Sequence, residues 1–542
     1  MGGRPNPRYG PAPVAALALV LAGAPGAALA GPLASPQSDP QVEALTAAVR
    51  ALEDRVAAEA AARQALEARL AAAEAVERLP AAAEADGGAA EPRAAPGIKV
   101  TFGGFLAAEA VYRSRNEASD ISSSFNRIPF DNAPQAHQHE LRGTARQTRL
   151  SVLLQGSAGP AVRFAGYGEI DFQGAAQTAN SIESNSYNPR LRHLYATLGW
   201  DNLGLEVLAG QTWSLATLNG KGISPRNELP PPLIDGQYIP GFVWARQPQL
   251  RLTKTWSNGL WAAVSLENPQ TTFASPATGI LGVAPGVEVL TSIPGVSGFD
   301  NGNSLSLNNL PDVVGKIAYE PRIGGRRPLH LEVFGLRRSY GARVDVKPGN
   351  ALGLAPGAFT VDADGGGVGG SVTATLAPLR LDLQASALTG RGIGRYGSAQ
   401  LPDATLRPDG SIEPVGQTMF LVGAVWHPSP RLDLYVFGGQ ERQTARFFDD
   451  STGHYGLGNP AATFTEDSCT TEGGVCAPNL RQVRQVSVGA WHKPYVGAFG
   501  QVRLGLEYSH TWVSGFPAGD FAPRTSEDMV FASFRYYPPV LD

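Results

Sequence analysis

Beyond its first thirty residues, the 542-residue sequence has no long apolar run. A membrane-spanning α-helix needs about 20 consecutive apolar residues, so none is expected after residue 30. This absence does not exclude transmembrane β-strands, because only every second residue of such a strand faces lipid. Charged residues are also scarce, at 17% of the chain, where about a quarter is usual in soluble domains.

The sequence has no basic excess, since 44 Lys and Arg stand against 48 Asp and Glu. Nucleic-acid binding is therefore not expected, because it needs a basic surface. The sequence contains no P-loop, G-x-S-x-G elbow or H-E-x-x-H motif. A G-x-G-x-x-G match within residues 365–370 has no βαβ context, and His137, His139 and Glu140 occur in a predicted exposed loop. We therefore expect no enzyme, no cofactor and no metal site.

Cysteine is nearly absent: the chain has two, Cys469 and Cys476, in the polar stretch EDSCTTEGGVCAPN. In an oxidising compartment, two cysteines this close predict a disulfide that closes a loop. Two thiols alone would make a poor structural zinc site, which takes four ligands.

The N-terminus has the features of a secretory signal. Arg4 and Arg8 precede an apolar stretch at residues 14–24, and Ala28-Leu29-Ala30 is a small-x-small cleavage site. The apolar stretch is too short to anchor the chain in a membrane. We expect residues 1–30 to be a signal peptide that is removed after export.

Residues 41–79 are rich in Ala, Glu, Arg and Leu and contain neither Gly nor Pro. A heptad that starts at Val42 has mostly apolar a and d positions, which favours a coiled coil and hence self-association. A single amphipathic helix is the alternative, but the rest of the chain offers little helical surface to pack against. Residues 80–97 are rich in Ala, Gly and Pro and predict a flexible linker.

From residue 98 to residue 542 the apolar pattern changes to a period of two. In VRLGLEYSHTW (502–512), apolar and aromatic side chains share one face and polar ones share the other. About sixteen such segments follow one another along the chain. The connections between them are alternately short turns and long polar loops, as in outer-membrane barrels. The sequence thus predicts an all-β transmembrane barrel of about sixteen antiparallel strands, preceded by the coiled coil in the periplasm.

Several segments resemble the DcaP-like porin family: QTRLSVLLQG (147–156), GYGEIDFQG (166–174), LRHLYATL (191–198), LAGQTWSL (208–215) and PGFVWARQPQLRLTK (240–254). The resemblance implies a trimeric, sixteen-stranded barrel in the outer membrane with a periplasmic coiled coil. It also implies passive transport of small anionic solutes, notably dicarboxylates.

Selectivity of a pore depends on its width and on the charges at its narrowest level. Residues 213–245 follow the fifth predicted strand, where a loop of large porins folds inward, and Pro230, Pro231 and Pro232 would stiffen this one. Arginine forks bind both oxygens of a carboxylate. The candidate pore-lining and anion-binding residues are Arg149, Arg163, Arg192, Arg226, Arg246, Arg251 and Arg503. Alternatively, these arginines pair with Glu169, Asp171 and Glu206 and only hold the wall together.

The function predicted from the sequence is that of an outer-membrane porin for small hydrophilic, anionic solutes. The alternative is a structural protein that tethers the outer membrane to the cell envelope through its coiled coil, with a closed or plugged barrel.

Overall fold

The structure is a computed structural model that describes residues 97–131, 133–159, 161–174, 188–274, 283–295, 304–461, 479–517, 519 and 522–539. All of these belong to the unit Arg93–Asp542. The predicted signal peptide and coiled coil, the linker up to residue 96, and Cys469 and Cys476 lie outside the described residues. Within the described ranges, no helix is long and apolar enough to cross a membrane.

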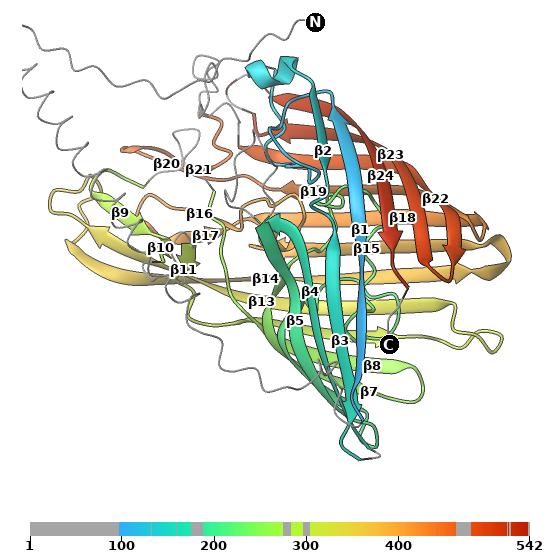
Figure 1. The fold of residues 1–542 in the computed structure, drawn as a ribbon. Helices are drawn as coiled ribbons and strands as arrows, with labels where there is room; N and C mark the ends of the chain where they lie inside the picture. Colours follow the sequence, from blue (N-terminus) through green and yellow to red (C-terminus); the bar gives the residue numbers. More distant parts are fainter. Residues whose placement is uncertain are drawn as a thin grey trace, which may run out of the picture. The chain divides into compact units, whose positions relative to one another are not determined.

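In the described part of the chain, sixteen antiparallel strands form a closed barrel in which β24 pairs back onto β1 (Figure 1). They are β1 (Lys99–Arg113), β3 (Arg149–Ser157), β4 (Val162–Gly174), β5 (Asn188–Trp200), β6 (Leu205–Trp213), β7 (Arg246–Thr255), β8 (Leu260–Glu267), β12 (Asp312–Tyr319), β13 (Leu329–Val346), β14 (Gly357–Leu376), β15 (Leu381–Arg391), β18 (Gly416–Ser429), β19 (Leu432–Gln443), β22 (Leu480–Gly497), β23 (Gly500–Gly515) and β24 (Arg524–Tyr537). The predicted barrel is confirmed, and each predicted segment overlaps one of these strands.

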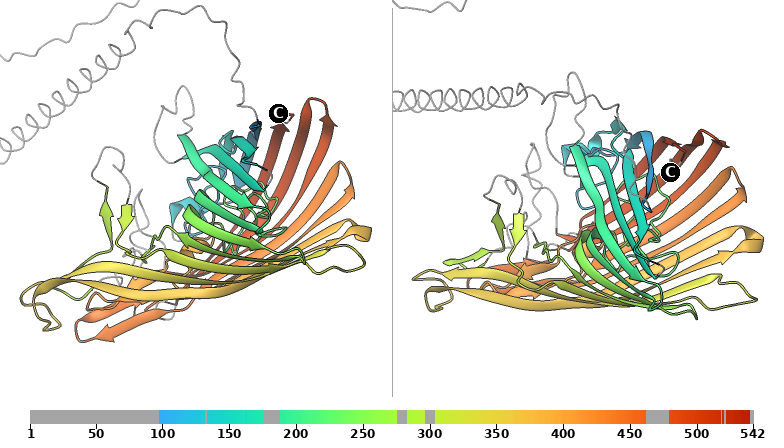
Figure 2. Two further views of the ribbon diagram at one scale, coloured as in Figure 1. Left: turned by 90° about the horizontal axis from the view of Figure 1, so that it is seen from below. Right: turned by 60° about the horizontal axis from the view of Figure 1, so that its bottom comes forward.

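The connections between wall strands hold further short elements. The additional strands are β2 (Glu140–Thr144), β9 (Val287–Leu290), β10 (Ser292–Pro294), β11 (Ser304–Ser306), β16 (Ala404–Leu406), β17 (Ile412–Pro414), β20 (Arg446–Asp450) and β21 (Gly453–Leu457), and the 3-10 turns are η1 (Pro134–His137), η3 (Ala377–Leu379) and η4 (Gly394–Tyr396). Strands β13 and β14 are long and project past their neighbours (Figure 2). The alternation in the sequence predicts a wall strand that ends at residue 340 and a loop over residues 341–366. In the structure, Ala342 and Val344 instead continue β13, where they are buried, so the predicted loop is too long.

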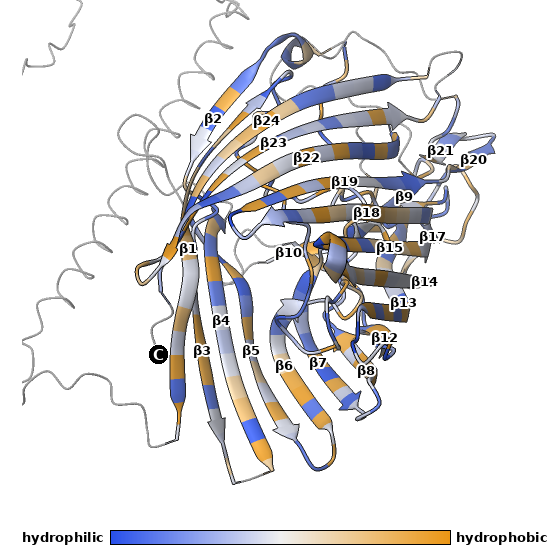
Figure 3. Cartoon of the chain, turned by 90° about the vertical axis from the view of Figure 1, so that its right-hand side faces the viewer, coloured by the Kyte–Doolittle hydropathy of each residue, from blue (hydrophilic) through white to orange (hydrophobic). Residues whose placement is uncertain are grey.

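The barrel wall is polar inside and apolar outside. On β7, Leu250 and Leu252 are 52% and 45% exposed, whereas Arg251 between them is 2% exposed. Figure 3 shows the same alternation of hydrophobic and hydrophilic residues along the neighbouring wall strands. An outer face of this kind is stable against lipid, because apolar side chains there have no polar groups to desolvate. The closed sheet also gives the backbone N–H and C=O groups their hydrogen-bond partners.

Strand β1 closes the barrel by pairing on both sides. Its first half, up to Phe105, pairs with β3, and its second half pairs with β24 and with β2. Gly104 lies just before this change of partner; its φ is 119°, and a Cβ atom there would lie 2.1 Å from the carbonyl oxygen of Arg149. Only glycine adopts this backbone conformation without strain and tolerates this close approach. One strand can therefore join the first and last parts of the wall.

Candidate functional site

The connection between β6 and β7, residues 214–245, folds into the barrel and is here called the inner loop. Its backbone N–H groups donate to glutamates of the barrel: Leu215 to Glu267 (2.8 Å), Asn219 to Glu332 (3.3 Å), Gly222 to Glu320 (2.9 Å), Ile234 to Glu507 (2.5 Å) and Gly241 to Glu441 (2.8 Å). These glutamates come from β8, from β13 and the turn before it, and from β19 and β23. Because these parts of the wall are separated by many strands, the inner loop must cross the lumen.

Apolar side chains fix the inner loop to the wall. Ile234, Ile239 and Phe242 are buried in one cluster with Phe437 and Trp491 of the wall. The indole N–H of Trp491 also donates to the carbonyl oxygen of Pro232 at 2.8 Å. The inward loop that the sequence predicted is thus a packed part of the barrel interior.

Four arginines gather at the inner loop, and we call Arg149, Arg190, Arg192 and Arg246 the arginine cluster. Arg192 bonds Glu169 at 2.6 Å and Asp171 at 2.9 Å, and Arg190 bonds Asp171 at 2.6 Å. The guanidinium group of Arg246 lies 4.6 Å from the ring centre of Trp213, and its Nη1 has no hydrogen-bond partner among the described residues. Two carboxylates against four guanidinium groups leave a surplus of two positive charges.

A β-bulge brings Arg192 into this cluster. The pairing of β4 with β5 shifts between Glu169 and Ile170, so that Arg192 and its neighbour His193 are both buried on the inner side. A bulge redirects a side chain in this way by placing two residues opposite one. Strict alternation along the sequence could not have oriented both residues correctly.

Tyr238 of the inner loop lies among these arginines. Its hydroxyl oxygen is 3.4 Å from Nη2 of Arg192 and 3.5 Å from Nη2 of Arg149. Burial raises the pKa of Tyr238, but the positive charges of Arg149, Arg192 and Arg246 outweigh burial and lower the pKa to about 7. The lowered pKa of Tyr238 therefore indicates a positive electrostatic potential in this part of the lumen.

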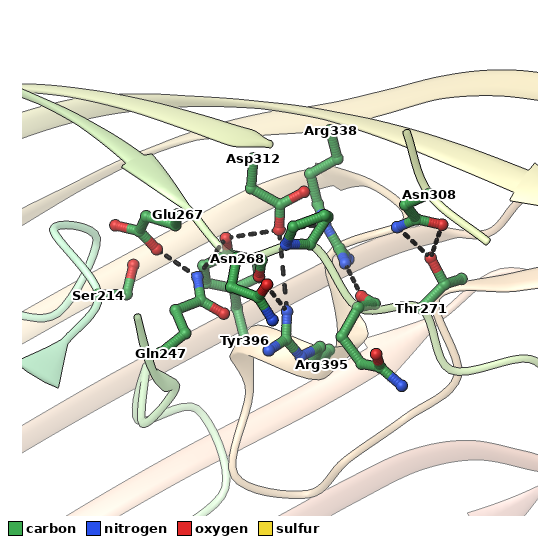
Figure 4. Close-up of polar contacts among 12 residues, drawn as sticks. Ser214, Gln247, Glu267, Asn268, Thr271, Asn308, Asp312, Arg338, Arg395 and Tyr396 are labelled. Atoms are coloured by element: carbon green, nitrogen blue, oxygen red, sulfur yellow. Dashed lines mark hydrogen bonds and ion pairs between the residues drawn. The ribbon is translucent and has the colours of Figure 1, made fainter. Parts of the chain in front are cut away.

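A cavity of about 1050 Å³, here called the vestibule, opens among the long loops on one side of the cluster. Its charged lining residues are Arg127, Arg190, Arg246, Arg395 and Glu117. Figure 4 shows how the wall behind Arg395 is organised: Asp312 contacts Arg395 (3.9 Å), Arg338 (3.0 Å) and the hydroxyl of Tyr396 (2.9 Å). Arg338 is fully buried, whereas Arg395 reaches the cavity.

A second cavity of about 560 Å³, here called the lower chamber, lies on the short-turn side of the inner loop. Arg149 and Tyr238 line it together with Arg503, Arg535 and Tyr537 of β23 and β24. Arg190 and Arg246 of the same cluster line the vestibule. The arginine cluster thus lies between two cavities of small-molecule size.

The comparisons with known proteins support this architecture. The outer membrane channel DcaP of Acinetobacter baumannii is similar over 82% of this chain and 98% of its own, with a TM-score of 0.56 and 18% sequence identity. This barrel has the fold of that channel. An anion-selective porin from Comamonas acidovorans (TM-score 0.43, 13% identity, 81% and 99% of the two chains) and OmpF of Salmonella typhi (0.43, 10%, 81% and 98%) are more distant. No family model matches the chain, and no curated protein matches it.

The resemblance to DcaP-like porins found in the sequence is thus supported at the level of the fold. Of the candidate arginines, the structure brings Arg149, Arg192 and Arg246 together. Arg251 is buried and donates to Gln249 and to the carbonyl oxygen of Trp213. Its side chain therefore has fixed partners in the wall.

The other three candidates lie apart from the cluster. Arg163 is exposed at the short-turn rim and bonds Asp201 at 2.6 Å. Arg226 lines a third cavity, of about 450 Å³, together with Arg163 and Glu206. Arg503 lines the lower chamber and stacks on Tyr537, with 4.5 Å between the guanidinium carbon and the ring centre.

Sequence analysis missed Arg190, Arg395 and Tyr238. Arg190 shares a face with Arg192 by simple alternation, so its position could have been inferred. Arg395 and Tyr238 lie in long connections, where no periodic pattern indicates which side chains point into a cavity. In the described ranges, no group of three or more His, Cys, Asp or Glu side chains could hold a metal ion.

Proposed function

We propose that this protein is an outer-membrane porin through which small hydrophilic anions, carboxylates among them, diffuse passively. The observation that carries the proposal is the composition of the vestibule, where four arginines meet one glutamate. An anion that leaves the vestibule next meets the arginine cluster and then the lower chamber.

Electrostatics supports a preference for anions at this position. Guanidinium groups at a constriction attract anions and repel cations, and local charge decides selectivity whatever the net charge of the protein. The surplus of two positive charges lies beside the inner loop, which crosses the lumen, and we take this to be the narrowest level of the pore. Carboxylates suit the arginine forks because both oxygens can be bound at once.

The test is ion selectivity in a planar lipid bilayer. Purified protein should form conducting channels, and the reversal potential in a KCl gradient should show Cl⁻ passing more readily than K⁺. Arg246→Gln and Arg149→Gln should each lower the Cl⁻-to-K⁺ permeability ratio, by about threefold or more, because each removes one of the surplus charges.

Arg337→Gln is the matched control. Arg337 also lies on a wall strand, but its side chain is 73% exposed and pairs with Asp364. Its loss should leave the permeability ratio unchanged. A protein that inserts without conducting, or that conducts with no preference for anions, would contradict the proposal.

The resemblance further supports a homo-oligomer, with a trimer as the expected state. Crosslinking of the protein in native membranes would test it, and a monomer band alone would contradict it.

A further inference from the structure

A row of buried polar side chains lies at the long-loop end of β22, β23 and β24, away from the arginine cluster. Gln485 pairs with Thr511, and Thr511 pairs with Glu527, so the three residues are direct neighbours across three strands. Their side chains are 1%, 0% and 0% exposed. All three therefore point inward and are covered.

Glu117, from the loop after β1, meets this row. Its Oε2 accepts the backbone N–H of Ser124 at 2.6 Å, which fixes the carboxylate against the wall. Close by, Nε of Arg115 donates to the carbonyl oxygen of Ser526 at 2.6 Å, so the loop that holds Glu117 lies against the strand position next to Glu527. Two buried carboxyl groups that lie near each other repel when both are charged, so a positive charge beside them favours their charged forms.

Within the described part of the chain, five buried oxygens at this place have no hydrogen-bond partner: Oε1 of Glu117, Oε1 and Oε2 of Glu527, Oγ1 of Thr511 and Oε1 of Gln485. Buried polar atoms in folded proteins are nearly always satisfied, and a group of unsatisfied ones indicates water or an ion. Nε2 of Gln485 and Nε of Arg113 are also without a partner there, but the oxygens outnumber these nitrogens, and two carboxylates supply three of the five oxygens.

Arg113 forms a long ion pair with Glu117, but one arginine does not balance both carboxylates. The cation that faces Glu527 together with Glu117 is Arg113. Its Nη atoms are already bonded to Glu140 (2.7 Å) and to the carbonyl oxygens of Ser119 (3.0 Å) and Asp120 (2.6 Å). Its Nε stays 3.9 Å from the nearer oxygen of Glu117.

We propose that Glu117, Glu527, Thr511 and Gln485 form a binding site for a divalent cation, with Ca²⁺ as its ligand. Ca²⁺ takes six to eight oxygens in flexible geometry, so about five protein oxygens and one or two waters would complete its shell. Mg²⁺ demands a near-ideal octahedron, which oxygens from three strands and a loop do not offer. The site has only two carboxylates, so it is smaller than a group of three His, Cys, Asp or Glu side chains, and the described ranges contain no such group around an ion site.

The alternative is a proton shared between Glu117 and Glu527, which would give partners to fewer of the buried oxygens. A proton joins one oxygen of Glu117 to one of Glu527 and leaves Thr511 and Gln485 without partners. A cation binds all of them and brings two charges to two carboxylates. Glu117 is also one of the residues at the vestibule, although its side chain is covered, so the site lies just behind the vestibule wall. The bound ion would tie the loop after β1 to the barrel wall.

The test is Ca²⁺ binding by the full-length protein, refolded in detergent without lipopolysaccharide and freed of metal by chelation. Calorimetric titration should give a dissociation constant of about 10⁻⁴ to 10⁻³ M, the range of extracellular Ca²⁺ modules. Ca²⁺ should also raise the unfolding midpoint, because a ligand of the folded state stabilises it. Mg²⁺ should bind at least about tenfold more weakly.

Glu527→Gln and Thr511→Val should each weaken Ca²⁺ binding, the first at least about tenfold. Thr511→Val keeps the shape of the side chain and both carboxylates, so it remains informative if Glu527→Gln does not fold. Glu288→Gln, in an exposed ion pair with Lys347, is the control and should bind as the wild type does. Two results would overturn the proposal. One is an unfolding midpoint of the wild type that does not change with Ca²⁺, and the other is an unchanged Ca²⁺ affinity in both site variants.

Discussion

Oε2 of Glu507, on wall strand β23, accepts the backbone N–H of Ile234 of the inner loop at 2.5 Å. The same oxygen accepts the hydroxyl of Tyr435 at 2.8 Å, and Oε1 accepts the hydroxyl of Ser509 at 3.0 Å. One buried carboxylate thus joins the loop to two wall strands.

Glu507→Leu should loosen the inner loop. It leaves the backbone N–H of Ile234 and the hydroxyl of Tyr435 without an acceptor, at a cost of about 1–3 kcal/mol each, whereas the hydroxyl of Ser509 can still bond that of Ser487 at 2.7 Å. We expect faster cleavage within residues 214–245 by added protease, measured by mass spectrometry of the fragments. Glu507→Gln keeps one carbonyl acceptor and should be cleaved at a rate between those of the wild type and Glu507→Leu. Equal rates for all three would show that this bond does not hold the loop.

Arg192→Gln should destabilise the barrel. Arg192 is 2% exposed and bridges Glu169 and Asp171, so its loss leaves buried carboxylates short of a cation. Breaking a buried ion pair on one side costs about 3–5 kcal/mol. Urea unfolding followed by circular dichroism should show the loss.

Arg246→Gln provides the comparison for Arg192→Gln. Arg246 stacks on Trp213 and belongs to the same cluster, where it is surrounded by other arginines. We expect its replacement to change selectivity with little loss of stability. If both variants lost stability equally, the distinction between a bridging and an uncompensated arginine would be wrong.

Tyr238 should make anion selectivity depend on pH. Its pKa is lowered to about 7, from an ordinary value near 10. Folding therefore gains stability from the phenolate above pH 10, and this gain is lost as pH falls through about 7. As pH rises from 6 to 8, one positive charge of the surplus is cancelled.

The Cl⁻-to-K⁺ permeability ratio should accordingly decrease as pH rises through about 7. Tyr238→Phe should remove this step and keep the high ratio of the low-pH form. Tyr112→Phe, on the lipid-facing side and 44% exposed, should retain the step. A step that persists in Tyr238→Phe would assign it to another group.

Gly104→Val should impair closure of the barrel. The positive φ of Gly104 is strained for a β-branched residue, and a Cβ atom would collide with the backbone at Arg149. We expect a smaller folded fraction in heat-modifiable gel mobility. Gly103→Val tests the neighbouring position, where a Cβ atom would meet only the side-chain oxygen of Ser151, at 3.0 Å. An equal yield of folded Gly104→Val would contradict this account of the closure.

The sequence by itself determined the barrel wall. A strand between lipid and a polar lumen must alternate, and its backbone must pair with neighbours on both sides, so period and turn spacing located every wall strand. Val530, Phe534 and Ser533 face the sides that alternation assigns to them. The end of β13 was predicted to be a loop because its polarity is the reverse of the wall pattern: Ala342 and Val344 are buried, whereas Arg343 between them is exposed.

Only the tertiary structure decided which charges are free. Arg192 and Arg246 look alike in the sequence, yet one is bridged by two carboxylates and the other is not. The difference arises from a bulge in β5 and from the inner loop, which brings Tyr238 to arginines of three different strands. Contacts between segments so far apart depend on how the chain closes and where its loops pack, and no local pattern records them.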